Sequence, residues 1–179
     1  MLETLITSKT RIKLILKFFL NPENNAYLRG LADELSESSN AIRVELNRLT
    51  EAGLLELMNN GGRTKLYKAN KKHPFFTDLH NIVKKNLGVD KLIDTILAKL
   101  GNIELAFITG DYARGIDTGI IDLVIIGNID KNYLQVLIDK TENIIKRKIR
   151  PLILVKEEYD MHKTTLELDT ALVVWNKGA

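Results

Sequence analysis

The stretch from Leu28 to Leu54 constrains the fold of this chain more than any other, because its pattern predicts two short helices joined by a polar turn. Apolar residues at helical spacing place the first helix at about 29–35. Serines follow, and a serine hydroxyl can cap the unpaired amides at the start of a second helix near Ser39. We expect Gly53 to end that helix.

The second helix is predicted to have two different faces. Ile42, Leu46 and Leu49 recur at helical spacing and should face inward. The opposite face offers short polar groups and one arginine, which are able to reach the edges of bases. A polar helix face is most often only solvated surface, so a role in binding DNA has to be judged from the elements that follow the helix. The residues expected on this outer face are Ser39, Asn40, Arg43, Val44 and Asn47.

A hairpin is predicted directly after this helix. Residues 54–58 have the pattern of a strand, 59–62 are Asn and Gly residues that accept positive φ, and 63–68 have the pattern of a return strand. We expect one edge of this hairpin to carry positive charge that could lie against phosphates. The cations on the return strand are Arg63, Lys65 and Lys68. A short strand at 26–28 is expected to pair with the hairpin.

This order of elements, over Lys9 to Asn70, resembles the winged helix-turn-helix of arsenical-repressor-type regulators. The run that carries the resemblance is Ser39, Ile42, Leu46, Leu49 and Ala52-Gly53-Leu54. The resemblance implies a domain at 1–72 that binds double-stranded DNA with its second helix and its hairpin wing. It also implies that 73–88 form a linker and a dimerisation helix.

A homodimer is expected for a second reason. A first helix at 8–20 and a later helix at 75–87 both carry more apolar residues than one small winged domain can bury. Two-fold symmetry would then require palindromic DNA sites, with half-sites about 34–36 Å or a multiple apart.

Composition narrows the class of protein. The 179 residues are 45% hydrophobic, which suffices for packed cores. Residues 1–88 hold 14 Lys and Arg against 9 Asp and Glu, whereas residues 89–179 hold 12 against 14, so the basic half is the N-terminal one. The chain has no cysteine and its three histidines are scattered, so we expect no structural metal. No stretch has a membrane-spanning or signal-peptide pattern, and we expect a cytoplasmic protein.

Residues 89–179 are predicted to form a second domain in which strands and helices alternate. A helix is expected at 90–100, and strands are expected at 103–109 and 122–126. A long helix at 131–148 should lead to a strand at 149–155, a short helix and a last strand at 171–175. The whole chain is therefore expected to be α+β or α/β, with a winged domain followed by a mixed-sheet domain.

Two motifs in this domain resemble the signature of minimal nucleotidyltransferases of the DNA polymerase beta superfamily. They are Gly110-Asp111-Tyr112-Ala113-Arg114-Gly115 and Asp122-Leu123-Val124-Ile125-Ile126-Gly127. In that superfamily a Gly-Ser pair begins a helix that cradles phosphates. An Asp-x-Asp pair on the next strand and a third carboxylate hold two Mg²⁺ ions, which clamp the reacting oxygens.

The match is partial, and its departures predict a domain without catalysis, metal or cofactor. Asp111 replaces the Ser, Ile120 replaces the first Asp of the pair, and Arg150 lies on the strand where the third carboxylate would be. A rearranged site using Asp117 or Asp111 is an alternative. The vestigial motif then consists of Gly110, Asp111, Arg114, Gly115 and Asp122.

The leading hypothesis is a sequence-specific DNA-binding transcription regulator whose nucleotidyltransferase-like domain is inactive and senses a nucleotide or small-molecule effector, or supports the dimer. One alternative is an active nucleotidyl or adenylyl transferase, similar to toxin-antitoxin members of the superfamily, tethered to a DNA-binding domain. Another is an interaction module whose wing meets protein.

Overall fold

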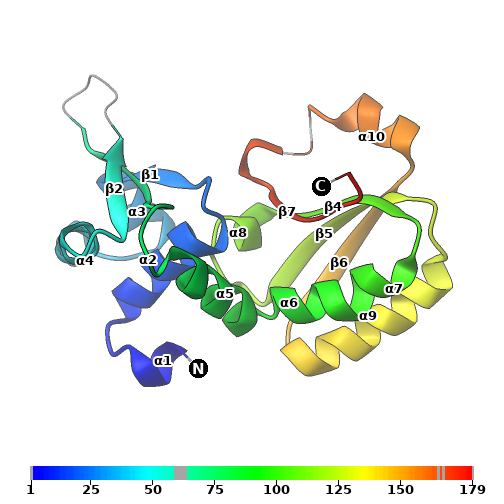
Figure 1. The fold of residues 1–179 in the computed structure, drawn as a ribbon, viewed down its shortest axis with the longest axis horizontal. Helices are drawn as coiled ribbons and strands as arrows, with labels where there is room; N and C mark the ends of the chain where they lie inside the picture. The colour runs from blue at the N-terminus through cyan, green and yellow to red at the C-terminus, as the bar shows by residue number, and fades with distance from the viewer. Residues whose placement is uncertain (1, 59–63, 165, 167, 179) are drawn as a thin grey trace. The chain divides into compact units, whose positions relative to one another are not determined.

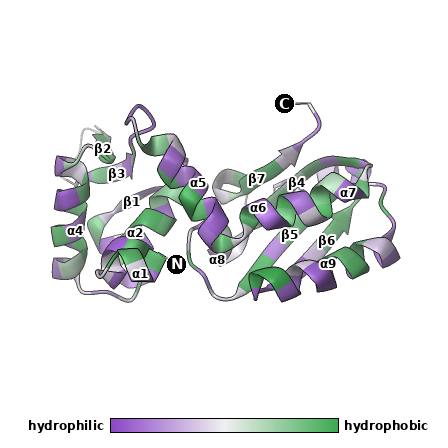
Figure 2. Cartoon of the chain, turned by 60° about the horizontal axis from the view of Figure 1, so that its bottom comes forward, coloured by the Kyte–Doolittle hydropathy of each residue, from purple (hydrophilic) through white to green (hydrophobic). Residues whose placement is uncertain are grey.

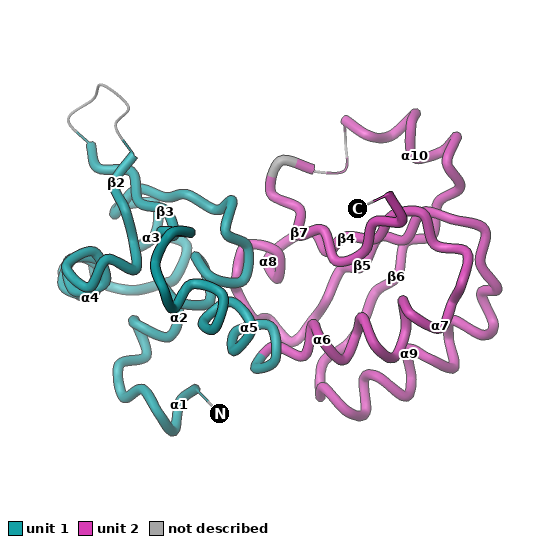
Figure 3. The backbone as a smooth tube through the Cα atoms, in the orientation of Figure 1, with its two compact units in different colours: residues 1–86 teal, residues 87–179 magenta. Residues whose placement is uncertain are grey.

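The computed structural model describes residues 2–58, 64–164, 166 and 168–178 (Figure 1). The chain divides into two compact units, residues 1–86 and 87–179 (Figure 3). This division lies just before residue 89, where we expected the second domain to begin, and it assigns most of the segment 73–88 to the first unit. Helices combine with two sheets, which confirms the predicted mixed α and β class.

The two predicted helices of the 28–54 stretch are α3 (Leu28–Glu34) and α4 (Ser39–Glu51). The hydroxyl of Ser38 caps α4 by accepting a hydrogen bond from the amide of Ala41 at 3.1 Å. Gly53, which we expected to end this helix, directly follows its C-cap residue Ala52 and has a φ of +72°. The amide of Leu54 then donates to the carbonyl of Leu49 at 2.9 Å, which satisfies an otherwise unpaired carbonyl of the last turn.

Three further helices build the first unit: α1 (Leu2–Leu5), α2 (Lys9–Leu20) and α5 (Phe76–Leu87). The core is formed largely by α2 against α3 and α4, through Ile12, Leu14, Ile15, Phe18, Phe19, Leu20, Leu31, Ile42 and Leu46. Most apolar residues of α2 lie inside the unit, which leaves α2 little apolar surface for the expected dimer contact. The α5 segment differs, since Phe75 and Ile82 stay 64% and 37% exposed.

A three-stranded antiparallel sheet completes the first unit in the order β1-β3-β2. Its strands are β1 (Asn25–Tyr27), β2 (Leu55–Met58) and β3 (Leu66–Ala69). The predicted pairing of the short first strand with the hairpin is confirmed, with Tyr27 opposite Leu66. The return strand begins three residues later than expected, so Lys65 precedes it. The expected turn at 59–62 and Arg63 lie outside the described residues.

The second unit is built on a four-stranded sheet in the order β6-β5-β4-β7. The strands are β4 (Ile103–Thr109), β5 (Ile120–Gly127), β6 (Lys148–Leu154) and β7 (Leu172–Asn176). Only the pairing of β5 with β6 is parallel, so this sheet is mixed as predicted. Strand β5 carries an uninterrupted apolar run from Leu123 to Ile126, as expected where helices cover both faces of a sheet.

Helices lie on both sides of this sheet (Figure 1). On one side lie α9 (Lys131–Ile145) and a helical segment at 89–100, and α9 shows alternating hydrophobic and hydrophilic bands (Figure 2). On the other side lies α10 (Lys156–His162), whose Tyr159 packs with Phe107, Val124 and Ile126. A short 3₁₀ helix, η2 (Leu168–Thr170), leads into β7.

The helix expected at 90–100 is interrupted by a wider turn. It consists of α6 (Val89–Leu92), the π-helical η1 (Ile93–Leu97) and α7 (Ala98–Leu100). A π-helical turn rotates the following residues around the axis, which periodicity at 3.6 residues cannot anticipate. The helix expected to reach residue 148 stops at Ile145, because Lys146 adopts a left-handed conformation.

Candidate nucleic-acid interface and an arginine-paired cleft

The outer face of α4 carries the side chains that the sequence assigned to it. Ser39, Asn40, Arg43, Val44 and Asn47 are all exposed. On the opposite face, Ile42 and Leu46 are fully buried. The helix is therefore fixed to the unit by one face and presents short polar groups and one guanidinium on the other.

Part of this face borders a hollow of about 530 Å³ in the first unit. The hollow brings together three of the predicted residues, Arg43, Asn47 and Lys65, although they come from α4 and from the approach to β3. The remaining lining residues are Tyr27, Leu28, Arg29, Thr64 and Tyr67. Three cations thus converge from three segments of the chain, and no carboxylate lies among the described lining residues.

The sequence did not lead us to expect four of these lining residues at the interface: Tyr27, Arg29, Thr64 and Tyr67. A signal for them existed, because the predicted pairing of the strand at 26–28 with the hairpin brings the start of α3 beside the return strand. Burial raises the pKa of the Tyr67 hydroxyl, and the charge of Arg43 opposes this only in part. The phenol is therefore neutral at pH 7.

Lys68 does not take the position expected for it. It lies opposite Glu56 in the β2–β3 register, and its Nζ is 3.1 Å from Glu56 Oε1. Side chains alternate along β3, so Lys68 points to the opposite face from Tyr67, which lines the hollow. The expectation that Lys65 and Lys68 share one charged edge is therefore wrong, because the spacing of three residues places them on opposite faces.

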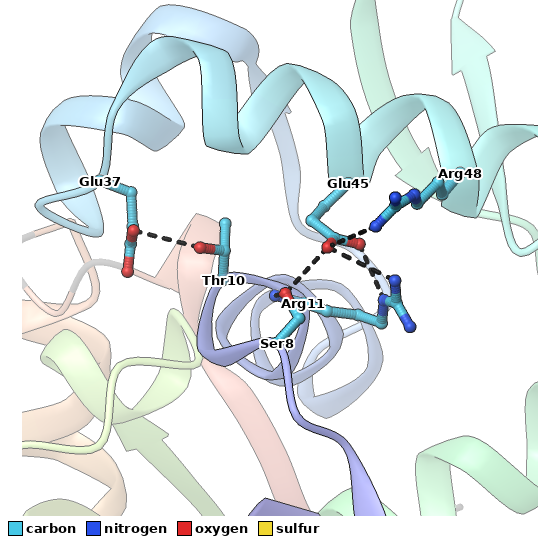
Figure 4. Close-up of polar contacts among 6 residues, drawn as sticks. All are labelled: Ser8, Thr10, Arg11, Glu37, Glu45 and Arg48. Atoms are coloured by element: carbon cyan, nitrogen blue, oxygen red, sulfur yellow. Dashed lines mark hydrogen bonds and ion pairs between the residues drawn. The ribbon is translucent and has the colours of Figure 1, made fainter.

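Side chains at the start of α2 bind carboxylates of α4 and of the turn that precedes it (Figure 4). Glu45 of α4 has a side chain only 7% exposed, and it accepts hydrogen bonds from Ser8 Oγ and Arg11 Nε, each at 2.8 Å. Arg11 Nη2 and Arg48 Nη1 add further bonds at 3.4 and 3.2 Å. Burial acts to raise the pKa of Glu45, but the hydrogen bonds from Arg11 and Ser8 outweigh it and hold the pKa below its usual value.

Two more carboxylates of the helix pair are bound in the same way. Glu37, in the turn, accepts from Lys13 Nζ at 2.6 Å and from Thr10 Oγ1 at 3.1 Å, and the bond from Lys13 lowers its pKa. Glu34 of α3 pairs with the buried Lys17 at 2.7 Å. These contacts pair three acids of α3, α4 and the turn between them with cations of α2.

The second candidate site is a cleft of about 360 Å³ on the sheet of the second unit. It contains Gly110, the first residue of the short helix α8 (Gly110–Ala113), and the carboxylate of Asp122 on β5. Gly110 has a φ of +67°, and a Cβ there would lie 3.1 Å from Asp122 Oδ2. The remaining lining is Thr109, Leu123, Val124, Arg150, Pro151, Leu152 and Leu166.

Arg150 engages Asp122 with two bonds, from Nε to Oδ1 at 2.6 Å and from Nη2 to Oδ2 at 2.8 Å. The pairing follows from the fold, because the parallel register places Arg150 directly beside Asp122. The hydrogen bonds raise the pKa of Arg150. A guanidinium therefore occupies both oxygens of the one carboxylate that matches the superfamily motif.

The two other acids weighed as substitute ligands are also bound to arginines. Asp111 pairs with Arg114 one helical turn later. Asp117 is held by Arg147, with Nε–Oδ1 at 3.1 Å and Nη2–Oδ2 at 2.6 Å. Gly115, the last residue of the vestigial motif, is buried with a φ of +83°. Among the described residues, no group of three or more His, Cys, Asp or Glu side chains could hold a metal ion.

Helix α8 is fixed to the second unit by a buried side chain. Tyr112, 1% exposed, donates a hydrogen bond from its hydroxyl to the carbonyl oxygen of Leu87. Burial raises the pKa of this hydroxyl, so it stays a donor at all ordinary pH values. Gly110 and Asp111 therefore lie on a helix that is anchored through Tyr112.

Comparisons with known proteins identify no family for this chain. No family model matches it, and no curated protein matches it. A chain from the solved structure of a tri-AMPylated HEPN toxin in complex with MNT antitoxin, from Shewanella oneidensis, aligns with a TM-score of 0.38 and 11% identity. The alignment covers 52% of this chain and 74% of that one, and a likeness at this level does not establish a shared fold. In the described part of the chain, no helix is long and apolar enough to cross a membrane.

Proposed function

We propose that this protein is a sequence-specific, double-stranded-DNA-binding transcription regulator acting in the cytoplasm. Its first unit would be a winged helix-turn-helix of the arsenical-repressor type, with α4 as the recognition helix and the β2–β3 hairpin as the wing. Its second unit would be a nucleotidyltransferase-like domain that has lost catalysis.

The observation that carries the proposal is the convergence of Arg29, Arg43 and Lys65 around the exposed face of α4. Within the described residues, none of these three cations lies within ion-pair distance of a carboxylate. Phosphates provide most of the affinity of DNA-binding proteins, and a guanidinium beside an amide suits the donors and acceptors of base edges. Arg43 and Asn47 supply that pair on one helix face.

The proposal that the second unit does not transfer nucleotides rests on the ion pairs of its acids. Two-metal chemistry needs several carboxylates that are free to bind Mg²⁺, an ion that dehydrates reluctantly. Asp122 is bonded through both oxygens to Arg150, and Asp117 is bonded to Arg147. Displacing a bidentate guanidinium would add to the cost of binding each ion.

We also propose a homodimer, now through the α5 segment alone. An apolar groove of about 390 Å³ lies between this segment and the end of α4, and it is lined by Ala52, Leu54, His73, Phe75, Asp78, Leu79 and Ile82. Sedimentation of the full chain at micromolar concentration, with and without DNA, tests this proposal. A dimer that Ile82→Lys weakens supports it, and a monomer under both conditions contradicts it.

The function itself is tested by selecting bound duplexes from a random-sequence pool and measuring their affinity against scrambled duplexes over a salt series. The proposal predicts a preferred sequence, and log Kd that changes by about 0.9 per log unit of salt for each phosphate neutralised. A chain without salt-dependent affinity for DNA would instead favour the interaction module whose wing meets protein.

A further inference from the structure

The hollow beside α4 has the size of a small-molecule site as well as the positive charge of a phosphate contact. Its volume of about 530 Å³ lies inside the range of about 300–1,000 Å³ found for small-molecule sites. Three segments of the chain supply its walls: the end of β1 with the start of α3, the middle of α4, and the approach to β3. Such sites are mostly apolar, with a few convergent polar groups that fix orientation.

The charges of the hollow select the sign of a ligand. Arg29, Arg43 and Lys65 line it together, and its described residues include no Asp or Glu. An arginine guanidinium presents a planar fork of donors that matches a carboxylate or a phosphate, and the lysine adds a point charge. A ligand that placed an anionic group among these side chains would be attracted by all three.

The remaining lining selects the body of a ligand. Tyr27, Leu28 and Tyr67 contribute ring and aliphatic surface, while Asn47 and Thr64 contribute neutral polar groups. Aromatic side chains bury large areas and favour flat partners by stacking or edge contacts. The neutral phenol of Tyr67 adds no negative charge that would oppose an anion. An apolar or aromatic body with one anionic group therefore matches both parts of the lining.

We propose that this hollow binds a small organic anion, a flat apolar body that carries a phosphate or carboxylate, and that the bound anion excludes DNA. The exclusion rests on the proposed function, because Arg43 and Asn47 would serve both ligands. An anion bonded to Arg43 removes the donors that a base edge needs, and its charge repels the nearby phosphates. The ligand would therefore act as an inducer that releases the protein from its operator.

The test uses 1-naphthyl phosphate as the probe on the full chain, with 1-naphthol and inorganic phosphate as its two halves. We expect the probe to bind more tightly than either half. Arg29→Gln and Lys65→Gln should each weaken it about tenfold or more, since each removes a charge-assisted bond. Both side chains are exposed, and urea unfolding checks that the variants keep their stability. Lys72→Gln, an exposed cation outside the hollow, is the matched control and should leave binding unchanged.

The results separate the ligand site from the DNA site. If 1-naphthol or inorganic phosphate binds as tightly as 1-naphthyl phosphate, the ligand does not need both halves. If Arg29→Gln binds the probe as tightly as the wild type, the probe does not bind in this hollow. A second titration adds the probe to the complex with a selected duplex, and we expect the apparent Kd for DNA to rise with probe concentration. A ternary complex would overturn the exclusion. If the wild type binds no DNA, the proposed function fails, while the first titration still decides the ligand site.

Discussion

Replacing Glu45 by Gln should destabilise the first unit by about 2 kcal/mol at pH 7. The buried carboxylate accepts bonds from Ser8, Arg11 and Arg48, and a hydrogen bond to a charged group contributes about 1.5–3 kcal/mol. Gln keeps one acceptor oxygen, so part of the network survives. Arg11 and Arg48 are 35% and 59% exposed and can rehydrate, which keeps the cost at the low end of that range.

The loss should depend on pH in a defined direction. The pKa of Glu45 is below its usual value in the folded chain, because the bonds from Arg11 and Ser8 outweigh the opposing effect of burial. A carboxyl whose pKa is lowered by folding contributes stability above its unfolded pKa, and this contribution disappears as the pH falls through the folded pKa. The difference between wild type and Glu45→Gln should therefore be largest at neutral pH and shrink below about pH 4.

Urea unfolding followed by circular dichroism, at several pH values between 7 and 3, measures this difference. Glu51→Gln is the matched control, since Glu51 lies exposed on the same helix. We expect it to change the free energy of unfolding by less than about 0.5 kcal/mol. If Glu45→Gln costs no more than Glu51→Gln, or if its cost is the same at pH 3 and pH 7, the α2–α4 network does not stabilise the unit as argued.

Three further predictions concern the wing, the helix ends and the cleft. Lys65→Ala should weaken binding to every duplex and flatten the salt slope by about one unit, whereas Lys68→Ala, whose cation is paired with Glu56, should change the slope little in the same anisotropy series. Gly53→Ala should cost about 1 kcal/mol in urea unfolding because φ is +72°, while Gly30→Ala inside α3, where an added Cβ would meet open space, should stabilise by up to about 1 kcal/mol. Full-length protein incubated with labelled nucleoside triphosphates, Mg²⁺ or Mn²⁺ and cell extract should transfer no label, and transfer that vanishes in Asp122→Ala would contradict this.

Local signals in the sequence predicted most of the elements. The serine-rich turn, the apolar spacing of Ile42, Leu46 and Leu49, and Gly53 located α3 and α4 almost to the residue. The apolar run at 103–109 coincides with β4. These features depend on propensity and capping within a few residues, which a single sequence displays directly.

Features that depend on register were harder to predict. The pairing of Lys68 with Glu56 follows from a hairpin register that the sequence did not fix, and it removed one of the expected cations. Arg29 lies at the hollow because β1 pairs with β3; the pairing was predicted, but which side chains it brings beside α4 depends on its register. The sequence showed that Arg150 is a cation where the superfamily has a carboxylate. Its two hydrogen bonds to Asp122, however, depend on the parallel register of β5 and β6.

The central claim is that α4 reads DNA sequence, and Arg43→Ala tests it most directly. Fluorescence anisotropy should compare the variant with the wild type on a selected duplex and on its scrambled counterpart, at one fixed salt concentration. We predict a loss of about 1–3 kcal/mol, or about 5- to 150-fold in Kd, on the selected duplex and a smaller loss on the scrambled one. Equal losses on the two duplexes, or none on either, would contradict base recognition by this helix.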